Sequence, residues 1–332
     1  AMPELVENDL SVAVLLPCYN EEATIADVVS RFRQTLPEAA IYVYDNNSKD
    51  LTALRARSAG AFVVREPRQG KGNVVRRMFA DIEADIYVMA DGDGTYAPED
   101  APQLINLLLT EGADMAVGTR RGVEDDAGRT GHAFGNRMFN GLYKRLFGSE
   151  FTDIFSGYRV FTRRMVKSFP AVSAGFEIET EMSVHASQLR LPVSELALDY
   201  GRRPEGSNSK LSTYRDGAKI LFMFAMLMKE THPARFFGVI AIAMFLAGLG
   251  FALPVVVEYL QTGLVPRMPT WIFSIGLMIV SLLLAVTGMI LDSVARGRAE
   301  QKRNFYLSVS RRAPRLPSGL VVSQDRRFSR IA

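Results

Sequence analysis

Two long uncharged apolar runs near the C-terminus restrict the possible folds of the chain more than any other sequence feature does. Residues 236–257 and 271–291 are 22 and 21 residues long and contain no charged side chain. About 20 apolar residues cross the hydrocarbon core of a bilayer as a helix, whereas buried helices of soluble proteins are usually shorter and amphipathic. The two runs therefore predict a pair of membrane-spanning helices joined by the short segment 258–270.

The charge distribution gives the predicted helices a direction. Ten Lys and Arg residues against two acidic residues follow residue 292, and Lys229 and Arg235 precede the first run. Since basic residues stay on the cytoplasmic side, we expect both termini and the N-terminal part to face the cytoplasm, at the cytoplasmic (inner) membrane. A basic tail alone could indicate nucleic acid binding, but its position beside two spans favours an anionic lipid bilayer, and we expect no nucleic acid partner.

The residues before the first run alternate between short apolar segments and longer segments whose apolar residues have helical spacing. Such alternation is typical of a mostly parallel α/β sheet. Ligands of these sheets bind beyond the carboxyl ends of the strands, so we expect a site at that edge. The expected strands are residues 12–16, 41–44, 62–64 and 86–90, and the expected helices are residues 21–36, 52–59 and 74–82.

The turns after the strands exclude two common kinds of nucleotide site. A dinucleotide site needs Gly-x-Gly-x-x-Gly after the first strand, whereas this chain has Pro17 and Cys18 there. A P-loop needs Lys followed by Ser or Thr, but Lys71 is followed by Gly72. One cysteine and three histidines also argue against a disulfide framework and against a Cys- or His-based metal centre. Hydride transfer and ATP hydrolysis are therefore not supported.

Two aspartates directly follow the expected strand 86–90, in the turn Asp91-Gly92-Asp93. Carboxylates two residues apart in a strand-end turn can converge on one hard cation, and Mg²⁺ or Mn²⁺ prefers a few carboxylates together with water and phosphate. An Asp-x-Asp turn alone is usually solvated. Its position after a buried strand, at the edge where other polar turns end, favours a metal site.

Six short motifs follow one another in the N-terminal half of the chain: Pro17-Cys18-Tyr19-Asn20-Glu21-Glu22, Asp45-Asn46-Asn47-Ser48-Lys49-Asp50, Gly70-Lys71-Gly72, Asp91-Gly92-Asp93, Gly118-Thr119-Arg120 and Ser156-Gly157-Tyr158-Arg159. The series resembles the inverting glycosyltransferases of family two, and among them the polyprenyl-phosphate, dolichol-phosphate mannose synthase-like branch. The resemblance covers roughly residues 10–230 and implies a GT-A fold, with a Rossmann-like, mostly parallel sheet. The two apolar runs are similar to the membrane hairpin of bacterial members.

The resemblance and the apolar runs together predict four parts. Residues 1–210 would form a cytoplasmic GT-A domain, and residues 211–235 a juxtamembrane amphipathic helix. Residues 236–292 would hold the two transmembrane helices, and residues 293–332 a basic cytoplasmic tail. Residues 134–147 have helical spacing too, and could form either an interfacial helix or an ordinary core helix.

The resemblance also implies a donor site in which Asp91 and Asp93 hold Mg²⁺ or Mn²⁺ on the diphosphate of a nucleotide-sugar. The family often has Gln where this chain has Thr95, so a third metal ligand is not expected there. Tyr19 could instead be a packing residue, and Asp45 could close an Asx turn. The implied nucleotide-sugar-binding residues are Pro17, Tyr19, Glu21, Asp45, Lys71, Asp91, Gly92 and Asp93.

Catalytic roles implied by the resemblance fall mainly on basic residues that would bind phosphate. Asp153 is the best remaining acid, and it could act as a base or hold a loop by a hydrogen bond. Glu177, Glu179 and Glu181 could orient the acceptor loop, although an exposed helix face is favoured. The implied catalytic residues are Asp93, Asp153, Arg120, Arg129, Arg203 and Lys210.

We therefore expect an enzyme that transfers a sugar from a UDP- or GDP-linked donor to a membrane polyprenyl phosphate such as undecaprenyl phosphate. The reaction would be inverting and metal-dependent, and its product would serve cell-envelope glycan or glycolipid modification. A processive polysaccharide synthase is disfavoured, because it needs Gln-x-x-Arg-Trp and the single Trp271 lies in an apolar run. A non-catalytic, membrane-tethered nucleotide-sugar-binding module is the other alternative. Small residues leave a homo-oligomer open: Ala243, Ala247, Gly248 and Gly250.

Overall fold

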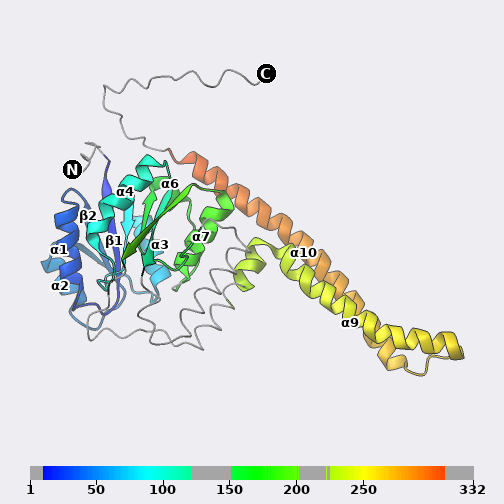
Figure 1. The fold of residues 1–332 in the computed structure, drawn as a ribbon. Coiled ribbons are helices and arrows are strands. Elements are labelled where there is room, and N and C mark those ends of the chain that lie inside the picture. Colours follow the sequence, from blue (N-terminus) through cyan, green and yellow to red (C-terminus); the bar gives the residue numbers. More distant parts are fainter. Residues whose placement is uncertain are drawn as a thin grey trace, which may run out of the picture.

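The computed structural model describes residues 10–121, 151–175, 177–199, 201, 222 and 225–310. An α/β domain forms one end of the molecule, and a long pair of helices projects from it (Figure 1). The expectations for residues 134–147, for most of 211–235 and for the tail after residue 310 lie outside the described residues.

The strands are β1 (Val12–Cys18), β2 (Ala40–Asp45), β3 (Phe62–Arg65), β4 (Ile86–Met89), β5 (Met115–Arg121), β6 (Arg159–Thr162) and β7 (Val193–Asp199). They form one seven-stranded sheet in the order β3-β2-β1-β4-β6-β5-β7. β6 runs antiparallel to β4 and β5, whereas the other strand pairs are parallel. The predicted mostly parallel α/β fold is therefore confirmed.

The helices of the domain are α1 (Ile25–Thr35), α2 (Thr52–Ser58), α3 (Lys71–Asp81), α4 (Ala101–Thr110), α6 (Arg163–Ser168) and α7 (Ile178–Leu189). Successive residues of β1 pack against opposite layers of these helices. Ala13 and Leu15 belong to a core cluster that includes residues of α3 and α7, and Val14 and Leu16 to a cluster that includes residues of α1 and α4. Because β1 is buried on both faces, it is a continuous apolar run, which made it recognisable in the sequence.

Two further helices, α9 (Pro233–Thr262) and α10 (Met268–Ser308), pack against each other and contain the two predicted spans. Both are long and apolar enough to cross a membrane. Large apolar side chains such as Leu260 and Leu282 are exposed on their surfaces. Gly248 lets the two helices come close, because a Cβ atom there would lie 3.1 Å from the main-chain oxygen of Ser274.

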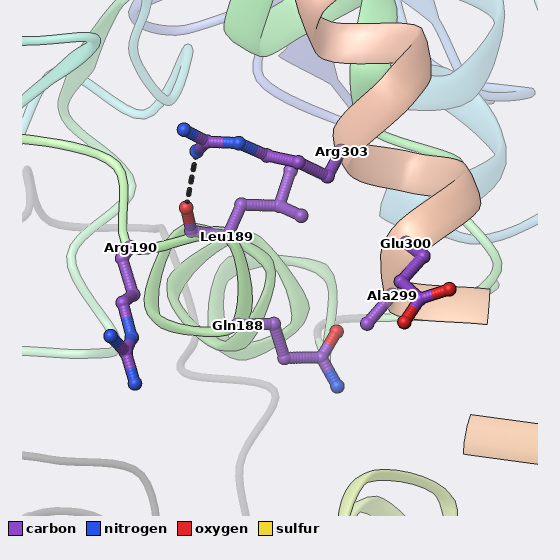
Figure 2. A pocket seen from close by; sticks show the side chains of 6 residues that line it. All are labelled: Gln188, Leu189, Arg190, Ala299, Glu300 and Arg303. Atoms are coloured by element: carbon purple, nitrogen blue, oxygen red, sulfur yellow. Dashed lines mark hydrogen bonds between the residues drawn. The ribbon is translucent and has the colours of Figure 1, made fainter. Parts of the chain in front are cut away.

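The basic segment that follows residue 292 begins as a helix, because α10 continues past the apolar run to pack against α6 and α7. Tyr306 is buried there, and its hydroxyl donates a 2.6 Å hydrogen bond to Oδ2 of Asp114. Arg303 donates a 2.8 Å hydrogen bond to the main-chain oxygen of Leu189, at the end of α7 (Figure 2). An open pocket of about 320 Å³ lies between the end of α7 and α10. The helical hairpin is thus joined to the α/β domain through buried contacts.

Candidate functional site

The ends of β1 and β2 lie side by side at the carboxyl edge of the sheet. Cys18 is opposite Asp45 in the strand register and Pro17 is opposite Tyr44, so the turn that begins with Tyr19 starts beside the turn that follows Asp45. Oδ2 of Asp45 accepts a 3.3 Å hydrogen bond from the main-chain N–H of Ser48, three residues further along the turn. Its Oδ1 is buried and has no hydrogen-bond partner in the described part of the chain. That oxygen could accept a hydrogen bond from an N–H or hydroxyl group of a nucleoside.

Gly92 fits tightly between the two aspartates and the turn after β1. A Cβ atom at this position would lie 2.5 Å from both Sγ of Cys18 and Oε2 of Glu21. The hydroxyl of Thr24 donates a 2.7 Å hydrogen bond to the Gly92 carbonyl and holds the backbone in place. Burial, together with the nearby Glu21 carboxylate, raises the pKa of the Cys18 thiol well above its ordinary value. Cys18 is therefore a small packing group that remains protonated, and a larger residue at position 92 would displace Cys18 or Glu21.

Asp91 and Asp93 follow β4 and differ in how firmly they are held. Asp93 is buried, and its Oδ1 accepts hydrogen bonds from the Thr95 main-chain N–H at 3.1 Å and from the Thr95 hydroxyl at 2.6 Å. Asp91 is partly exposed, and a Cβ atom at Gly157 would lie only 2.7 Å from its Oδ2. Thr95 therefore orients an aspartate, and glycine at position 157 leaves room beside the other.

The two carboxylates fit a hard divalent cation. Each carboxylate oxygen can accept more than one contact, so the hydrogen bond to Thr95 does not exhaust Asp93. Within the described ranges, no group of three or more His, Cys, Asp and Glu residues could hold a metal ion. Mg²⁺ and Mn²⁺ are commonly held by one or two carboxylates, with water and substrate phosphate completing the shell. The donor set thus suits a metal that is bound together with a phosphorylated ligand.

Lys71 connects the acidic turn to α7. The side chain is buried at the start of α3, and its Nζ forms ion pairs with Oδ1 of Asp91 and, at 2.5 Å, with Oε1 of Glu179. Burial alone would lower the pKa of Lys71, but Asp91 and Glu179 outweigh it and raise that pKa above its ordinary value. Lys71 is therefore an ammonium ion shared by two carboxylates.

The prediction that the acidic residues of 177–181 form an exposed helix face is wrong for Glu179. Glu179 is only 5% exposed, and its Oε2 has no hydrogen-bond partner among the residues that the structure describes. Most of α7 is buried, including small and polar residues such as Thr180 and Ser183. The sequence contains a signal for this burial, because residues 182–189 carry no Asp, Glu, Lys or Arg.

Glycines on both sides of Lys71 allow a loop to lie against the start of α3. A Cβ atom at Gly70 or Gly72 would lie 2.1 Å from a main-chain oxygen of Ala174 or Ser173. Glu181 holds the same loop, since it accepts hydrogen bonds from the main-chain N–H of Ser173 at 2.7 Å and of the preceding residue at 2.9 Å. The Gly-Lys-Gly motif is therefore explained by close backbone packing, which fixes the position of the Lys71 main chain.

Arg120 and Asp153 form a bidentate ion pair. Nε and Nη2 of Arg120 donate to the two carboxylate oxygens of Asp153 at 2.7 and 2.9 Å. Burial raises the pKa of Asp153, but the hydrogen bonds and charge of Arg120 outweigh it and leave that pKa below its ordinary value. Asp153 is thus an ionised partner of Arg120, beside the strand end that carries the Gly118-Thr119-Arg120 motif.

Arg159 belongs to a motif seen in the sequence, but its role was not predicted. Its side chain is completely buried. Its guanidinium donates to the main-chain oxygens of Ile154 and Ser156 at 2.8 Å, and to the hydroxyl of Ser183 at 3.0 Å. Arg159 therefore holds the segment that carries Asp153 against α7. The predicted catalytic residues Arg129, Arg203 and Lys210 lie outside the described residues.

The chain resembles one protein family and several known proteins. Residues 13–169 match glycosyl transferase family 2. The chain is 38% identical over 251 residues to glycosyltransferase AglJ of Haloferax volcanii, a match that covers 75% of this chain and 82% of that protein. It is 26% identical over 228 residues to undecaprenyl-phosphate mannosyltransferase of Micrococcus luteus, covering 61% of this chain and 88% of that protein.

A solved structure resembles the α/β domain. It is glucosyl-3-phosphoglycerate synthase from Mycobacterium tuberculosis, in complex with Mn²⁺, uridine-diphosphate-glucose and phosphoglyceric acid. The TM-score is 0.55 at 26% sequence identity, and the match covers 67% of this chain and 79% of that one. The fold found here therefore occurs in a protein that was crystallised with a divalent metal and a nucleotide-sugar.

Proposed function

The chain belongs to glycosyl transferase family 2 and is a glycosyltransferase with a GT-A fold, and we propose that its acceptor is a membrane polyprenyl phosphate. In this reaction the sugar comes from a UDP- or GDP-linked donor and its anomeric configuration is inverted. The main observation behind this proposal is that one chain contains both the sheet edge with Asp91 and Asp93 and a helical hairpin long enough to cross a membrane. The two parts are joined by buried contacts such as the hydrogen bond from Tyr306 to Asp114. The relative that acts on undecaprenyl phosphate supports the same acceptor class.

The proposed acceptor explains why a strong base is not needed. A phosphate monoester has a second pKa of about 6, so it is largely dianionic near neutral pH. One of its oxygens forms a bond to the anomeric carbon while the bond from that carbon to the diphosphate breaks, and the nucleoside diphosphate leaves with the electron pair. The ion pair between Asp153 and Arg120 then favours a positioning role for Asp153 over a role as base.

The residues at the sheet edge divide the remaining work. Asp45 would accept a hydrogen bond from the nucleoside through its unpartnered oxygen, beside Pro17, Tyr19 and Glu21. Mg²⁺ or Mn²⁺ held by Asp91 and Asp93 would offset the charge that develops on the leaving diphosphate. The acceptor phosphate would be bound by Arg129, Arg203 and Lys210, since arginine suits bidentate contacts to phosphate.

The membrane hairpin would hold the catalytic edge at the cytoplasmic surface of the inner membrane. A long polyprenyl chain stays in the bilayer while its phosphate reaches the surface. The exposed apolar side chains of α9 and α10 would lie in lipid, and the basic residues soon after the apolar run, Arg296 and Arg298, would face anionic headgroups.

The test is a donor screen on the full chain in lipid nanodiscs. Undecaprenyl phosphate is offered together with UDP- or GDP-linked sugars, and the release of UDP or GDP is measured. We expect release with at least one donor, reversible loss of release on chelation, and loss of release in Asp93→Ala. Glu99→Gln is the matched control, because Glu99 pairs with Arg31 on the surface and should keep full activity. Release with 3-phosphoglycerate but not with the lipid phosphate would show that the proposed acceptor is wrong.

A further inference from the structure

Glu179 introduces a buried negative charge that the mechanism above does not use. The only ion pair it forms within the described ranges is with Lys71, at 2.5 Å, and its second oxygen is left without a hydrogen bond. A buried carboxylate with an unsatisfied oxygen is unfavourable for stability, and apolar side chains of similar size usually serve a core better. The position of Glu179 beside the candidate metal site suggests that the charge acts on that site.

The charges around Lys71 show what Glu179 changes. Without Glu179, the ammonium group of Lys71 would pair with Asp91 alone and neutralise one of the two candidate metal ligands. With Glu179, the same ammonium is shared between two carboxylates on different elements, Asp91 after β4 and Glu179 on α7. Asp91, Asp93, Glu179 and Lys71 then have a combined formal charge of about −2, which a single divalent cation balances.

The packing around Lys71 fixes the position of its backbone. Its backbone lies at the start of α3, between two glycines that touch the main chain of the loop at residues 173–174. Glu181 holds that loop from α7, so the helix that carries Glu179 also fixes the place from which Lys71 extends. The distance between Lys71 and Glu179 is thus set by two packed elements, as is typical of residues that orient a metal ligand.

We propose that Glu179 is a positioning residue for the metal site: by holding the ammonium group of Lys71, it keeps Asp91 available to the divalent cation. The proposal rests on the proposed function in taking Asp91 and Asp93 as the metal ligands. It adds that the affinity for the metal depends on a carboxylate that lies 86 residues beyond Asp93 in the chain and that need not touch the metal.

The test measures Mn²⁺ binding to the full chain in nanodiscs by electron paramagnetic resonance, with Mn²⁺ alone and again with UDP or GDP present. In Glu179→Gln, Lys71 pairs with Asp91 only, and we expect the dissociation constant for Mn²⁺ to rise about 10- to 100-fold. Glu177→Gln is the matched control, because it removes the same charge two residues away, from an exposed carboxylate at the start of α7. We expect its Mn²⁺ affinity to stay within about twofold of the wild-type value.

A double variant separates this role from a structural one. Lys71→Met combined with Glu179→Gln removes the ammonium that competes for Asp91, so Mn²⁺ binding should recover relative to Glu179→Gln alone. A thermal unfolding midpoint measured without metal checks that each variant is folded. Equal Mn²⁺ affinity in wild type and Glu179→Gln, or no recovery in the double variant, would overturn this inference and leave the proposed function intact. A wild-type chain that binds no Mn²⁺ would overturn the metal site, and this inference with it.

Discussion

Buried carboxylates in two parts of the α/β domain differ in whether their oxygens accept hydrogen bonds. Where α10 packs on the domain, Asp114 is completely buried, and its oxygens accept hydrogen bonds from the hydroxyls of Thr162 at 2.7 Å and Tyr306 at 2.6 Å. At the carboxyl edge of the sheet, Asp45 and Glu179 each have a buried oxygen without a hydrogen-bond partner in the described residues.

This difference distinguishes a carboxylate that stabilises the fold from carboxylates that we propose bind a ligand or position a metal ligand. Buried polar groups in folded proteins are almost always hydrogen-bonded, so an exception needs an explanation such as a bound ligand or ion. The satisfied carboxylate joins two parts of the fold. Asp45 lies beside the end of β1, and Glu179 is connected through Lys71 to Asp91, at the edge where a nucleotide-sugar and a metal are proposed to bind. The predictions below test this separation.

The largest effect is expected at the satisfied carboxylate. Asp114→Ala leaves Tyr306 and Thr162 without their acceptor and Arg164 without its ion-pair partner. We expect the free energy of unfolding to fall by about 3 to 5 kcal/mol, measured by thermal or denaturant unfolding in detergent. Tyr306→Phe removes one of these hydrogen bonds and should give a smaller loss. Loss of turnover with unchanged stability in either variant would show that this group also serves catalysis.

The next effect concerns the geometry of the acidic turn. Gly92→Ala places a methyl group 2.5 Å from the side chains of Cys18 and Glu21, so either these side chains or the backbone between Asp91 and Asp93 must shift. A displacement of about 1 Å at a reacting site can lower turnover about 100-fold, and we expect a loss of that size in nucleotide release. Gly250→Ala is the control, since nothing lies within 4 Å of a Cβ atom there. Normal turnover in Gly92→Ala would mean that the turn need not be held as described.

A smaller effect is expected from Asp45→Asn, which tests an unsatisfied carboxylate directly. We expect the KM for the nucleotide-sugar to rise about tenfold, because one hydrogen bond to a charged group is lost. The unfolding midpoint without ligand should not fall. Asp50→Asn is the comparison. Oδ1 of Asp50 accepts hydrogen bonds from Thr52 at 2.5 and 3.0 Å, and Oδ2 accepts one from the Glu22 main-chain N–H at 3.3 Å, which an amide NH₂ group cannot accept, so the variant should affect stability without changing KM. A loss of stability in Asp45→Asn together with a raised KM in Asp50→Asn would contradict the assignment of Asp45 to ligand binding.

The smallest effect is a dependence of stability on acidic pH. The pKa of Asp153 in the folded chain lies below its ordinary value, since hydrogen bonds from Arg120 outweigh burial. The ion pair therefore stabilises the fold at pH values above the ordinary pKa of about 3.9, and this stabilisation is lost as pH falls through the lower, folded-state value. Unfolding midpoints between pH 6 and pH 3 should fall less steeply in Asp153→Asn than in wild type. Equal slopes would mean that the pair does not contribute.

The sequence was sufficient for features that depend on local pattern. The strands β1 to β4 are short apolar runs that end in polar turns, and the position of Asp91 and Asp93 after a buried strand follows from the same pattern. The pairing of Lys71 with Glu179 could not be predicted, because it depends on how α7 packs beside α3. The antiparallel strand β6 was not predicted either, because four residues of sequence do not specify their direction in a sheet.

The end of α10 shows a different limit of sequence patterns. The apolar run ends at residue 291, and charged residues follow, which marks where a bilayer would end rather than where the helix ends. The helix continues to Ser308, because Arg303 and Tyr306 find partners on the α/β domain. Contacts with another element, which hydropathy does not record, therefore decide its length.

Because α10 is one continuous helix, the number of residues between Asp292 and Tyr306 sets the distance between the apolar run and the α/β domain. Between Asp292 and Tyr306 the helix rises about 21 Å at 1.5 Å per residue. Deleting one residue there would rotate Tyr306 by about 100° away from Asp114, whereas deleting seven would nearly restore its direction and lower the domain by about 10 Å. Under the proposed membrane arrangement, the length of this helix segment sets the distance of the catalytic edge from the bilayer. Insertions or deletions of whole turns would change that distance and keep the contact between Tyr306 and Asp114.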